Sequence, residues 1–318
     1  MGVPEGFLEV SLGLGGGRGT VSVLTRDEDA KDDDWTDPNF FEPGYSVAGS
    51  TGFRVWEGTR VAADLLRPAS ERTYAYVLGA RGWEKHEAGA DADADEDADA
   101  DVDVDAAVEG VRVALEGKRV LELGSGTGLA ALALAKAGGA HVLATDLRAV
   151  VDDVLWVNVD RAAEGEGEGE GEGFFFPGGV RVGEGSVACY PLDWVSVESG
   201  EDWCRVTSLA RPQLALDPLG CACDVVLGVE CVWLAELVPS FVATVEAAFG
   251  RGARGGQALL IGRERATEAS TVFCSMGDVA AAFRARGLDV QEVVKTKAQD
   301  NDPSGEGFVS VYRVRLPS

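Results

Sequence analysis

Short apolar runs alternate with segments of helical spacing along the chain from residue 111 onward. Strands buried on both faces give nearly continuous apolar runs, whereas helices give longer stretches with apolar residues three or four positions apart. Regular alternation of the two is typical of a parallel sheet with helices on both faces. The pattern predicts seven strands, within 119–123, 141–145, 180–189, 224–228, 257–261, 288–294 and 308–315, and helices over 129–137, 150–162, 237–249 and 279–286.

The predicted fold class is α/β, a doubly wound and mostly parallel seven-stranded sheet within one domain, residues 51–318. The last two strands are long and are separated by a polar loop at 299–307, so we expect them to form an antiparallel hairpin. Residues 1–50 form an extension to this domain. It contains a predicted β-hairpin, made of the runs 7–10 and 20–24 with a glycine-rich connection between them.

Three further segments lie before the alternating region. Residues 27–45 are acidic, contain prolines and are expected to be irregular. The run Thr59–Leu66 predicts a short helix that ends before Pro68, because a residue preceding proline disfavours helical geometry. Residues 74–78 are expected to continue that helix or to pack against it.

Two low-complexity segments account for much of the acidity of the chain, whose formal net charge is −26. They are predicted insertions in surface loops, at 88–107 and at 164–173, and their repeated carboxylates lack apolar neighbours to bury. Without these fourteen carboxylates the formal net charge would be −12. The alternative is that the acidic runs attract a basic partner. In either case the acidity argues against binding of a phosphate backbone as the main role.

Composition also narrows the setting of the protein. The chain contains no run of about 18 apolar residues, so we expect no membrane span. The N-terminus lacks the basic and apolar blocks of a signal peptide, so we expect none. The six cysteines are scattered and only two histidines are present, so we expect no metal site. These features predict a cytoplasmic protein, with the nucleus as a further location.

A glycine turn after the first strand of the alternating region carries the candidate chemistry. Its glycines are Gly124, Gly126 and Gly128, and Leu129 stands where a dinucleotide-binding turn has its third glycine. Glu122 precedes the turn by two residues and would repel a pyrophosphate at the following helix N-terminus. An acid there suits a cationic ligand, such as the amino group of a methionine moiety. The turn therefore favours S-adenosylmethionine over NAD.

A second acid supports the same interpretation. Asp146 ends the next predicted strand, 18 residues after Gly128, where its carboxylate would accept hydrogen bonds from ribose hydroxyls. The alternative is an ordinary strand-to-helix turn without a ligand, which requires the two acids and three glycines to coincide by chance.

Four separated segments resemble one family. They are Gly52–Glu57, with its Gly-x-x-x-Trp pattern, the glycine turn, Leu192–Trp194, and Asp224–Trp233. Together they resemble the seven-β-strand S-adenosylmethionine-dependent methyltransferases, and within these the lysine methyltransferase-like group, methyltransferase family 16. The resemblance covers about residues 45–318 apart from the two acidic insertions, and it implies a Rossmann-like methyltransferase fold.

The resemblance implies a set of residues that contact the cofactor. The backbone of the glycine turn, an acid for the ribose and two tryptophans around the cofactor belong to it. For each tryptophan the alternative is an aromatic residue of the core. With Glu122 and Gly128 from the turn, the predicted cofactor-binding residues are Trp56, Glu122, Gly124, Ser125, Gly126, Gly128, Asp146, Trp194 and Val229.

The predicted catalytic residues are Glu230 and Trp233, which follow the apolar strand 224–228. The resemblance implies that an acid here orients the acceptor amine and that an aromatic side chain lines its channel. The family usually carries Tyr or Phe where this chain has Trp233. The alternative for Glu230 is that it caps a loop or the next helix. Cys231 is expected to serve packing.

The function implied is transfer of a methyl group to a lysine side chain of a protein. Alternatives are a histidine side chain or a small metabolite as acceptor, and a cofactor-binding interaction module without activity. A dehydrogenase is disfavoured by Glu122 and Leu129. We expect a protein partner that presents a lysine, no nucleic acid as main partner, no membrane association and a monomeric state.

Overall fold

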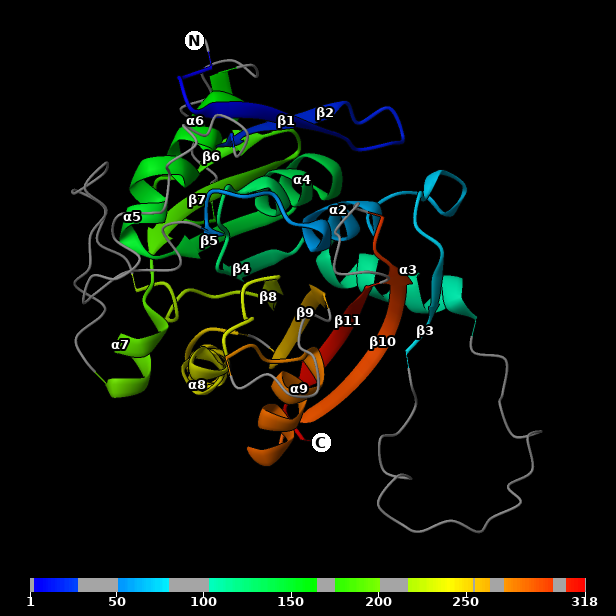
Figure 1. Ribbon diagram of the computed structural model, residues 1–318, viewed down its shortest axis with the longest axis vertical. Helices are drawn as coiled ribbons and strands as arrows, with labels where there is room; N and C mark the ends of the chain where they lie inside the picture. The colour runs from blue at the N-terminus through cyan, green and yellow to red at the C-terminus, as the bar shows by residue number, and fades with distance from the viewer. Residues whose placement is uncertain are drawn as a thin grey trace.

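A nine-stranded sheet forms the centre of the computed structural model (Figure 1), which describes residues 3–27, 51–79, 103–164, 175–200, 217–253, 255–263, 272–299 and 307–317. The predicted irregular segment 27–45 and the predicted insertion at 164–173 lie outside the described residues except at their ends. In spatial order the strands are β3 (Tyr76–Leu78), β10 (Asp289–Lys297), β11 (Phe308–Arg315), β9 (Gln257–Arg263), β8 (Val225–Val229), β4 (Arg119–Leu123), β5 (His141–Asp146), β7 (Gly185–Pro191) and β6 (Val180–Val182).

The seven predicted strands form the contiguous middle of this sheet. From β10 to β7 they all run in one direction, apart from β11, which pairs antiparallel with both β9 and β10. The predicted mostly parallel sheet and the predicted C-terminal hairpin are therefore confirmed. The carboxyl ends of β4, β5 and β8 consequently meet at one edge of the sheet.

Two short edge strands extend the sheet beyond the prediction. Residues 76–78 form β3, which pairs with β10, so the expectation that 74–78 continue the preceding helix is wrong. At the other edge the segment 180–189 is not one strand. It turns at Gly183, whose φ is +59°, and folds back as the antiparallel pair of β6 and β7.

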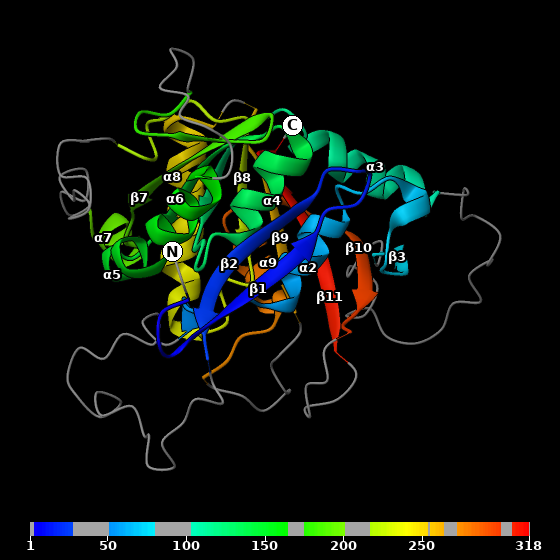
Figure 2. The same ribbon diagram turned by 90° about the horizontal axis from the view of Figure 1, so that it is seen from above.

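Helices cover both faces of the sheet, as Figures 1 and 2 show. One face packs against α2 (Glu57–Asp64), α3 (Val104–Leu115), α4 (Leu129–Gly138) and α6 (Trp156–Glu164). The other packs against α7 (Trp194–Ser199), α8 (Val238–Arg251) and α9 (Met276–Ala285). Short turns complete the described helical segments, at η1 (Ala69–Glu71), α5 (Arg148–Val150), the π-helical η3 (Val151–Leu155) and η5 (Ala235–Leu237). None of the helices in the described ranges is long and apolar enough to span a bilayer.

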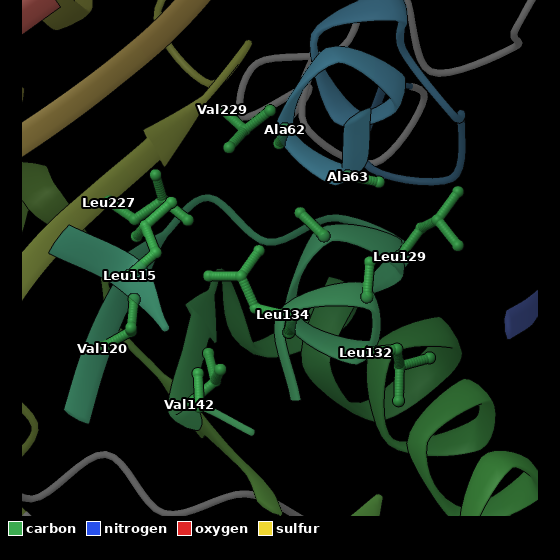
Figure 3. Close-up of a cluster of buried hydrophobic side chains, with 14 of the residues drawn as sticks. Ala62, Ala63, Leu115, Val120, Leu129, Leu132, Leu134, Val142, Leu227 and Val229 are labelled. Carbon is green, nitrogen blue, oxygen red and sulfur yellow. The ribbon is translucent and has the colours of Figure 1, made fainter. Parts of the chain in front are cut away.

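Alternation along β4 shows why both faces are buried. Val120 joins the cluster around α4, shown in Figure 3, whereas Leu121 and Leu123 join the cluster under α8 and α9. Side chains on a strand point alternately to opposite faces. An apolar run in a central strand thus supplies both layers of the core, as in other doubly wound sheets.

The helix α3 begins inside the predicted acidic insertion at 88–107. The Asp103 side chain accepts a hydrogen bond from the Asp105 backbone N–H at 2.9 Å and caps the helix, which starts at Val104. Val108, Val111 and Leu115 are fully buried along one face of it. The last residues of that segment are therefore structural, and the remainder of the insertion lies outside the described residues.

The N-terminal hairpin consists of β1 (Phe7–Gly13) and β2 (Thr20–Arg26), as predicted. It lies over α4 and α6 as a separate two-stranded sheet (Figure 2). The fully buried Asn158 on α6 connects it to the glycine turn. Its Oδ1 accepts from the Leu24 backbone N–H at 2.7 Å, and its Nδ2 donates to the carbonyl oxygens of Leu24 at 3.0 Å and Thr127 at 2.9 Å.

Replacement of Asn158 by alanine tests this connection. The change leaves three buried backbone groups without a partner, and each such group costs about 1–3 kcal/mol. We expect the free energy of unfolding to fall by about 3 kcal/mol or more, measured by urea denaturation. Val157→Ala on the exposed face of the same helix should change it by less than about 0.5 kcal/mol. An Asn158→Ala protein as stable as the wild type would contradict the assignment.

Candidate active site

A cavity of about 270 Å³ opens at the carboxyl ends of β4, β5 and β8. Ligands of open α/β sheets bind at this edge, where successive loops diverge. The lining comes from five separated stretches of the chain, namely parts of 51–59, 122–130, 146–147, 192–195 and 229–237. Of the predicted site residues, all but Gly128 line this one cavity.

The glycine turn has no room for side chains. A Cβ atom on Gly124 would lie 2.5 Å from the Cβ atom of Cys231, and one on Gly126 would lie 3.0 Å from the carbonyl oxygen of Gly52. Both glycines also have positive φ, +69° and +52°, which other residues adopt at a cost. The turn is held against β5 by Ser125, whose N–H donates to the Thr145 carbonyl oxygen at 2.9 Å.

Gly128 has a different role from the other two glycines. It begins α4 with φ +80°, and a Cβ atom there would lie 2.6 Å from Cδ1 of Leu155. It does not line the cavity. The structure therefore assigns Gly128 to the start of the helix rather than to contact with a ligand.

Asp146 ends β5 and faces the turn. Its Oδ2 accepts from the Gly126 N–H at 2.8 Å, and its Oδ1 accepts from the Leu147 N–H at 2.7 Å. Burial raises the pKa of this carboxyl to about 6, although the two hydrogen bonds act in the opposite direction. Each carboxylate oxygen can accept a second hydrogen bond, so the group is held in place and can still bind ligand hydroxyls.

Glu122 is the most deeply buried acid of the cavity, with 1% of its surface exposed. Burial raises its pKa to about 8, a hydrogen bond with Ser125 lowers it in part, and the charge of Asp146 raises it further. Its Oε2 atom has no hydrogen-bond partner. Buried polar groups are nearly always satisfied, so this oxygen fits a site whose missing donor comes from a ligand.

Both predicted tryptophans line the cavity and neither is fully buried, which does not favour the alternative of core aromatics. Trp194 begins α7, and its ring packs edge-on against Phe241 with centroids 5.1 Å apart. Trp56 is the N-cap residue of α2, and its Nε1 donates to the carbonyl oxygen of Thr51 at 3.3 Å. The Arg54 guanidinium lies over its ring, 5.0 Å from the centroid.

Glu230 and Trp233 line the same cavity from the loop after β8. Glu230 Oε1 accepts from the Gly58 N–H at 2.8 Å. This side chain therefore caps α2, which lies far before it in the chain, and not the helix that follows it. Trp233 stacks on Phe273, with ring centroids 5.6 Å apart and planes inclined by 27°. Whether either side chain contacts an acceptor stays a prediction.

Several lining residues escaped the sequence analysis. Those from the loop after β8 follow the predicted motif directly, and Arg54 lies within the tryptophan segment, so the motifs indicated their neighbourhood but not their role. Burial raises the pKa of the Cys231 thiol far above its usual range, which agrees with its expected packing role against Gly124. The additional lining residues include Thr51, Arg54, Thr59, Leu147, Leu192, Leu234, Glu236 and Leu237.

A family match covers the part of this site that precedes residue 169. Residues 46–168, which contain Trp56, the glycine turn and Asp146, match the family model described as lysine methyltransferase. Over this segment the chain is similar to the S-adenosylmethionine-dependent methyltransferases. The resemblance predicted from the sequence is confirmed over this segment, which is fewer than half of the 318 residues.

The solved structures that are similar to this chain have low sequence identity to it. An arsenic(III) S-adenosylmethionine methyltransferase from Chlamydomonas reinhardtii is 18% identical, with 64% of this chain and 65% of that chain covered and a TM-score of 0.40. An O-methyltransferase family protein from Burkholderia thailandensis is 14% identical, with 68% and 57% covered and a TM-score of 0.39. An S-adenosylmethionine-dependent methyltransferase from Aquifex aeolicus is 15% identical, with 66% of this chain and 89% of that chain covered and a TM-score of 0.39.

The similarity spans less than two thirds of the length of the first two of these structures. No curated protein matches the sequence.

The residues of the cavity fit S-adenosylmethionine on two observations. The unpaired Oε2 atom of Glu122 suits the cationic amino group of the cofactor's methionine moiety. The missing side chains at Gly124 and Gly126 leave space that a Cβ atom would fill. Asp146 would bind the ribose. The remainder of the cofactor would be surrounded by Trp56, Trp194 and the backbone of Val229.

Proton release on binding tests the assignment of Glu122. In the ligand-free protein its raised pKa keeps the carboxyl largely protonated at pH 7, whereas an adjacent cation stabilises the charged form. Binding of S-adenosylmethionine should therefore release a proton near pH 7, and affinity should rise from about pH 6 to about pH 8. Calorimetry in buffers of different ionisation enthalpy measures the released proton.

Glu122→Gln is the matched control, because glutamine keeps the shape of the side chain and does not titrate. The release attributed to Glu122 should be absent in that variant. Equal proton release by the two proteins would remove Glu122 from this role.

Proposed function

We propose that this protein is an S-adenosylmethionine-dependent methyltransferase, and that it transfers a methyl group to the side-chain amine of a lysine in a protein substrate. The charge of the cavity carries the proposal. Its lining contains five carboxyl side chains and one guanidinium, that of Arg54. Glu122 and Asp146 are assigned to the cofactor, which leaves three acids, Asp193, Glu230 and Glu236, to attract a cationic acceptor.

Aromatic side chains beside these acids support the same acceptor. Trp233, whose ring stacks on Phe273, lines the cavity with Glu230, and an aromatic face attracts an ammonium group at close range. Two antiparallel hydrogen bonds hold the pair, from the Cys274 N–H to the Trp233 carbonyl oxygen and from the Ala235 N–H to the Val272 carbonyl oxygen, each 2.9 Å. The family description of the matched segment agrees with a lysine acceptor.

The chain's own residues would prepare the amine. S-adenosylmethionine, when bound, supplies an electrophilic methyl group on a positively charged sulfur. A free lysine amine has a pKa near 10.4 and is protonated at pH 7, so the site must favour its neutral form. Entry into a cavity walled by Trp233, Leu234 and Leu237 removes water and lowers the amine's pKa. Glu230 would orient the remaining N–H bonds, and the rate would rise mainly through this positioning.

A histidine side chain is the second candidate acceptor. One observation favours it, namely that the Trp233 ring, which stacks on Phe273, gives the cavity a flat aromatic wall. Offset stacking on such a wall suits a planar imidazole. A neutral imidazole needs no deprotonation before it attacks the methyl group. The acids of the cavity would therefore contribute less to binding this acceptor than to binding a cationic amine.

Labelling of a cell extract tests the proposal. We expect the purified protein and tritiated S-adenosylmethionine to give a discrete labelled protein, with methyl-lysine identified by mass spectrometry. Asp146→Ala removes acceptor oxygens for the ribose and a partner of the Gly126 N–H, and hydrogen bonds to charged groups contribute about 1.5–3 kcal/mol. Labelling by that variant should fall at least tenfold at limiting cofactor.

The other outcomes are informative. Methyl-histidine in the labelled protein would show that the acceptor is a histidine side chain, the second candidate, and not a lysine. Label confined to the small-molecule fraction would contradict a protein substrate. Binding of S-adenosylmethionine without label in any fraction would favour a cofactor-binding module that does not transfer the methyl group.

A further inference from the structure

A hydrogen bond joins two parts of the active site that lie far apart in the sequence. The first is the segment 51–59, which contributes Thr51, Gly52, Arg54, Trp56 and Thr59 to the cavity and is called the cofactor cover below. The second is the loop after β8, which carries Glu230 and Trp233. The Gly58 N–H of the cover donates to Glu230 Oε1 at 2.8 Å across 172 positions of sequence.

We propose that Glu230 is a positioning residue that holds the cofactor cover in its binding conformation, with Gly58 as its required counterpart. The proposal rests on the proposed function for the identity of the acceptor, but its effect on the cofactor needs no acceptor. It assigns to one oxygen of Glu230 a role in cofactor binding that is separate from any contact of the carboxylate with a lysine amine.

The helix α2 lacks a local cap, and Glu230 supplies one. Trp56 is the N-cap residue and makes no side-chain cap hydrogen bond. The first backbone N–H groups of a helix have no partner within the helix, and the positive end of the helix dipole favours a carboxylate there. A capping acid from β8 therefore fixes both the start of α2 and its distance from the acceptor loop.

The contact also requires glycine at position 58. A Cβ atom there would lie 2.5 Å from Cγ of Glu230 and 3.0 Å from its Oε1, inside van der Waals contact. The φ angle of Gly58 is not in the left-handed region, so the glycine serves close approach rather than an unusual backbone conformation. Any side chain at this position would displace either the Glu230 side chain or the cover and so break the contact.

The backbone of Glu230 is strained in a way that aims its side chain. Among the described residues it is the one non-glycine residue with positive φ, +51°. Such a conformation costs about 1–3 kcal/mol and persists where surrounding contacts impose it. The Glu230 N–H donates to the Ile261 carbonyl oxygen at 2.8 Å, which continues the β8–β9 pairing and holds the residue in this conformation.

The neighbouring residue fixes the same helical turn from another side. Glu57 is 5% exposed, and its Oε1 accepts from the Tyr74 hydroxyl at 2.6 Å and from the Gln299 N–H at 2.8 Å. The start of α2 is thus bound to the loop after β10 as well as to the loop after β8. Loss of the Glu230 contact should free only the side of the cover that faces the cofactor.

The chemistry of the contact gives a clean separation of variants. Gln keeps an Oε1 acceptor of the same reach and loses the charge, so Glu230→Gln should retain the cap. Glu230→Ala removes the acceptor, and Gly58→Ala displaces it. Gly250→Ala is the matched control, because Gly250 is also helical and a Cβ atom there meets nothing within 4 Å.

The test measures S-adenosylmethionine affinity by calorimetry without any acceptor, together with the melting temperature of each ligand-free protein. We expect the dissociation constant to rise at least tenfold for Glu230→Ala and Gly58→Ala, and to stay within about twofold of wild type for Glu230→Gln and Gly250→Ala. Cooperative unfolding of the ligand-free variants would show that the effect on affinity is not a failure to fold.

Two results would overturn the proposal. Wild-type affinity in Glu230→Ala would show that the cover holds its position without the contact. Equal losses of affinity in Glu230→Gln and Glu230→Ala would assign the effect to charge rather than to the cap. Failure of the proposed function is distinguishable, because absence of methyl-lysine in labelled extracts would leave these cofactor affinities unchanged.

Discussion

A buried carboxyl group without a full set of partners governs the structure of this active site. Glu122 belongs to the central strand β4, is almost wholly enclosed and has one oxygen without a hydrogen bond. Its pKa of about 8 implies that ionising it in the ligand-free protein costs about 5 kcal/mol relative to water, at 1.36 kcal/mol for each unit of pKa. A positively charged ligand group offsets that cost, whereas a pyrophosphate would add to it.

The turn beside this acid depends on contacts from distant parts of the chain. Asn158 connects it to the N-terminal hairpin, Asp146 accepts one of its N–H groups, and Cys231 fills the space above Gly124. The hairpin also reaches the cofactor cover, because the Thr25 hydroxyl and the Arg26 N–H both donate to the Phe53 carbonyl oxygen, at 2.7 and 3.0 Å. The N-terminal extension therefore supports the cofactor site.

Regular patterns in the sequence were sufficient for the central sheet. Apolar runs such as 225–229 and 257–261 are typical of strands buried on both faces of a parallel sheet, so their strand conformation and burial followed from the pattern. The glycine turn and its two acids were likewise local signals, and together they predicted the cofactor. The edge strands β3 and β6 were missed because three residues carry too little periodicity to indicate a strand.

Other features could not be predicted because they depend on packing between distant residues. The capping of α2 by Glu230 joins positions 172 residues apart, and the tight contact at Gly58 exists only once both elements are in place. Gly128 was grouped with its neighbours by spacing, although its position against Leu155 gives it a different role. The start of α3 at Val104 was not predicted, because it lies within the acidic segment 88–107.

The most direct test of the account is a calorimetric comparison of S-adenosylmethionine and NAD as ligands of the wild-type protein. The geometry around Glu122 predicts saturable one-to-one binding of S-adenosylmethionine and no detectable binding of NAD under the same conditions. Tighter binding of NAD would contradict the assignment of the cavity, because a cationic ligand offsets the cost of ionising Glu122 and a pyrophosphate does not.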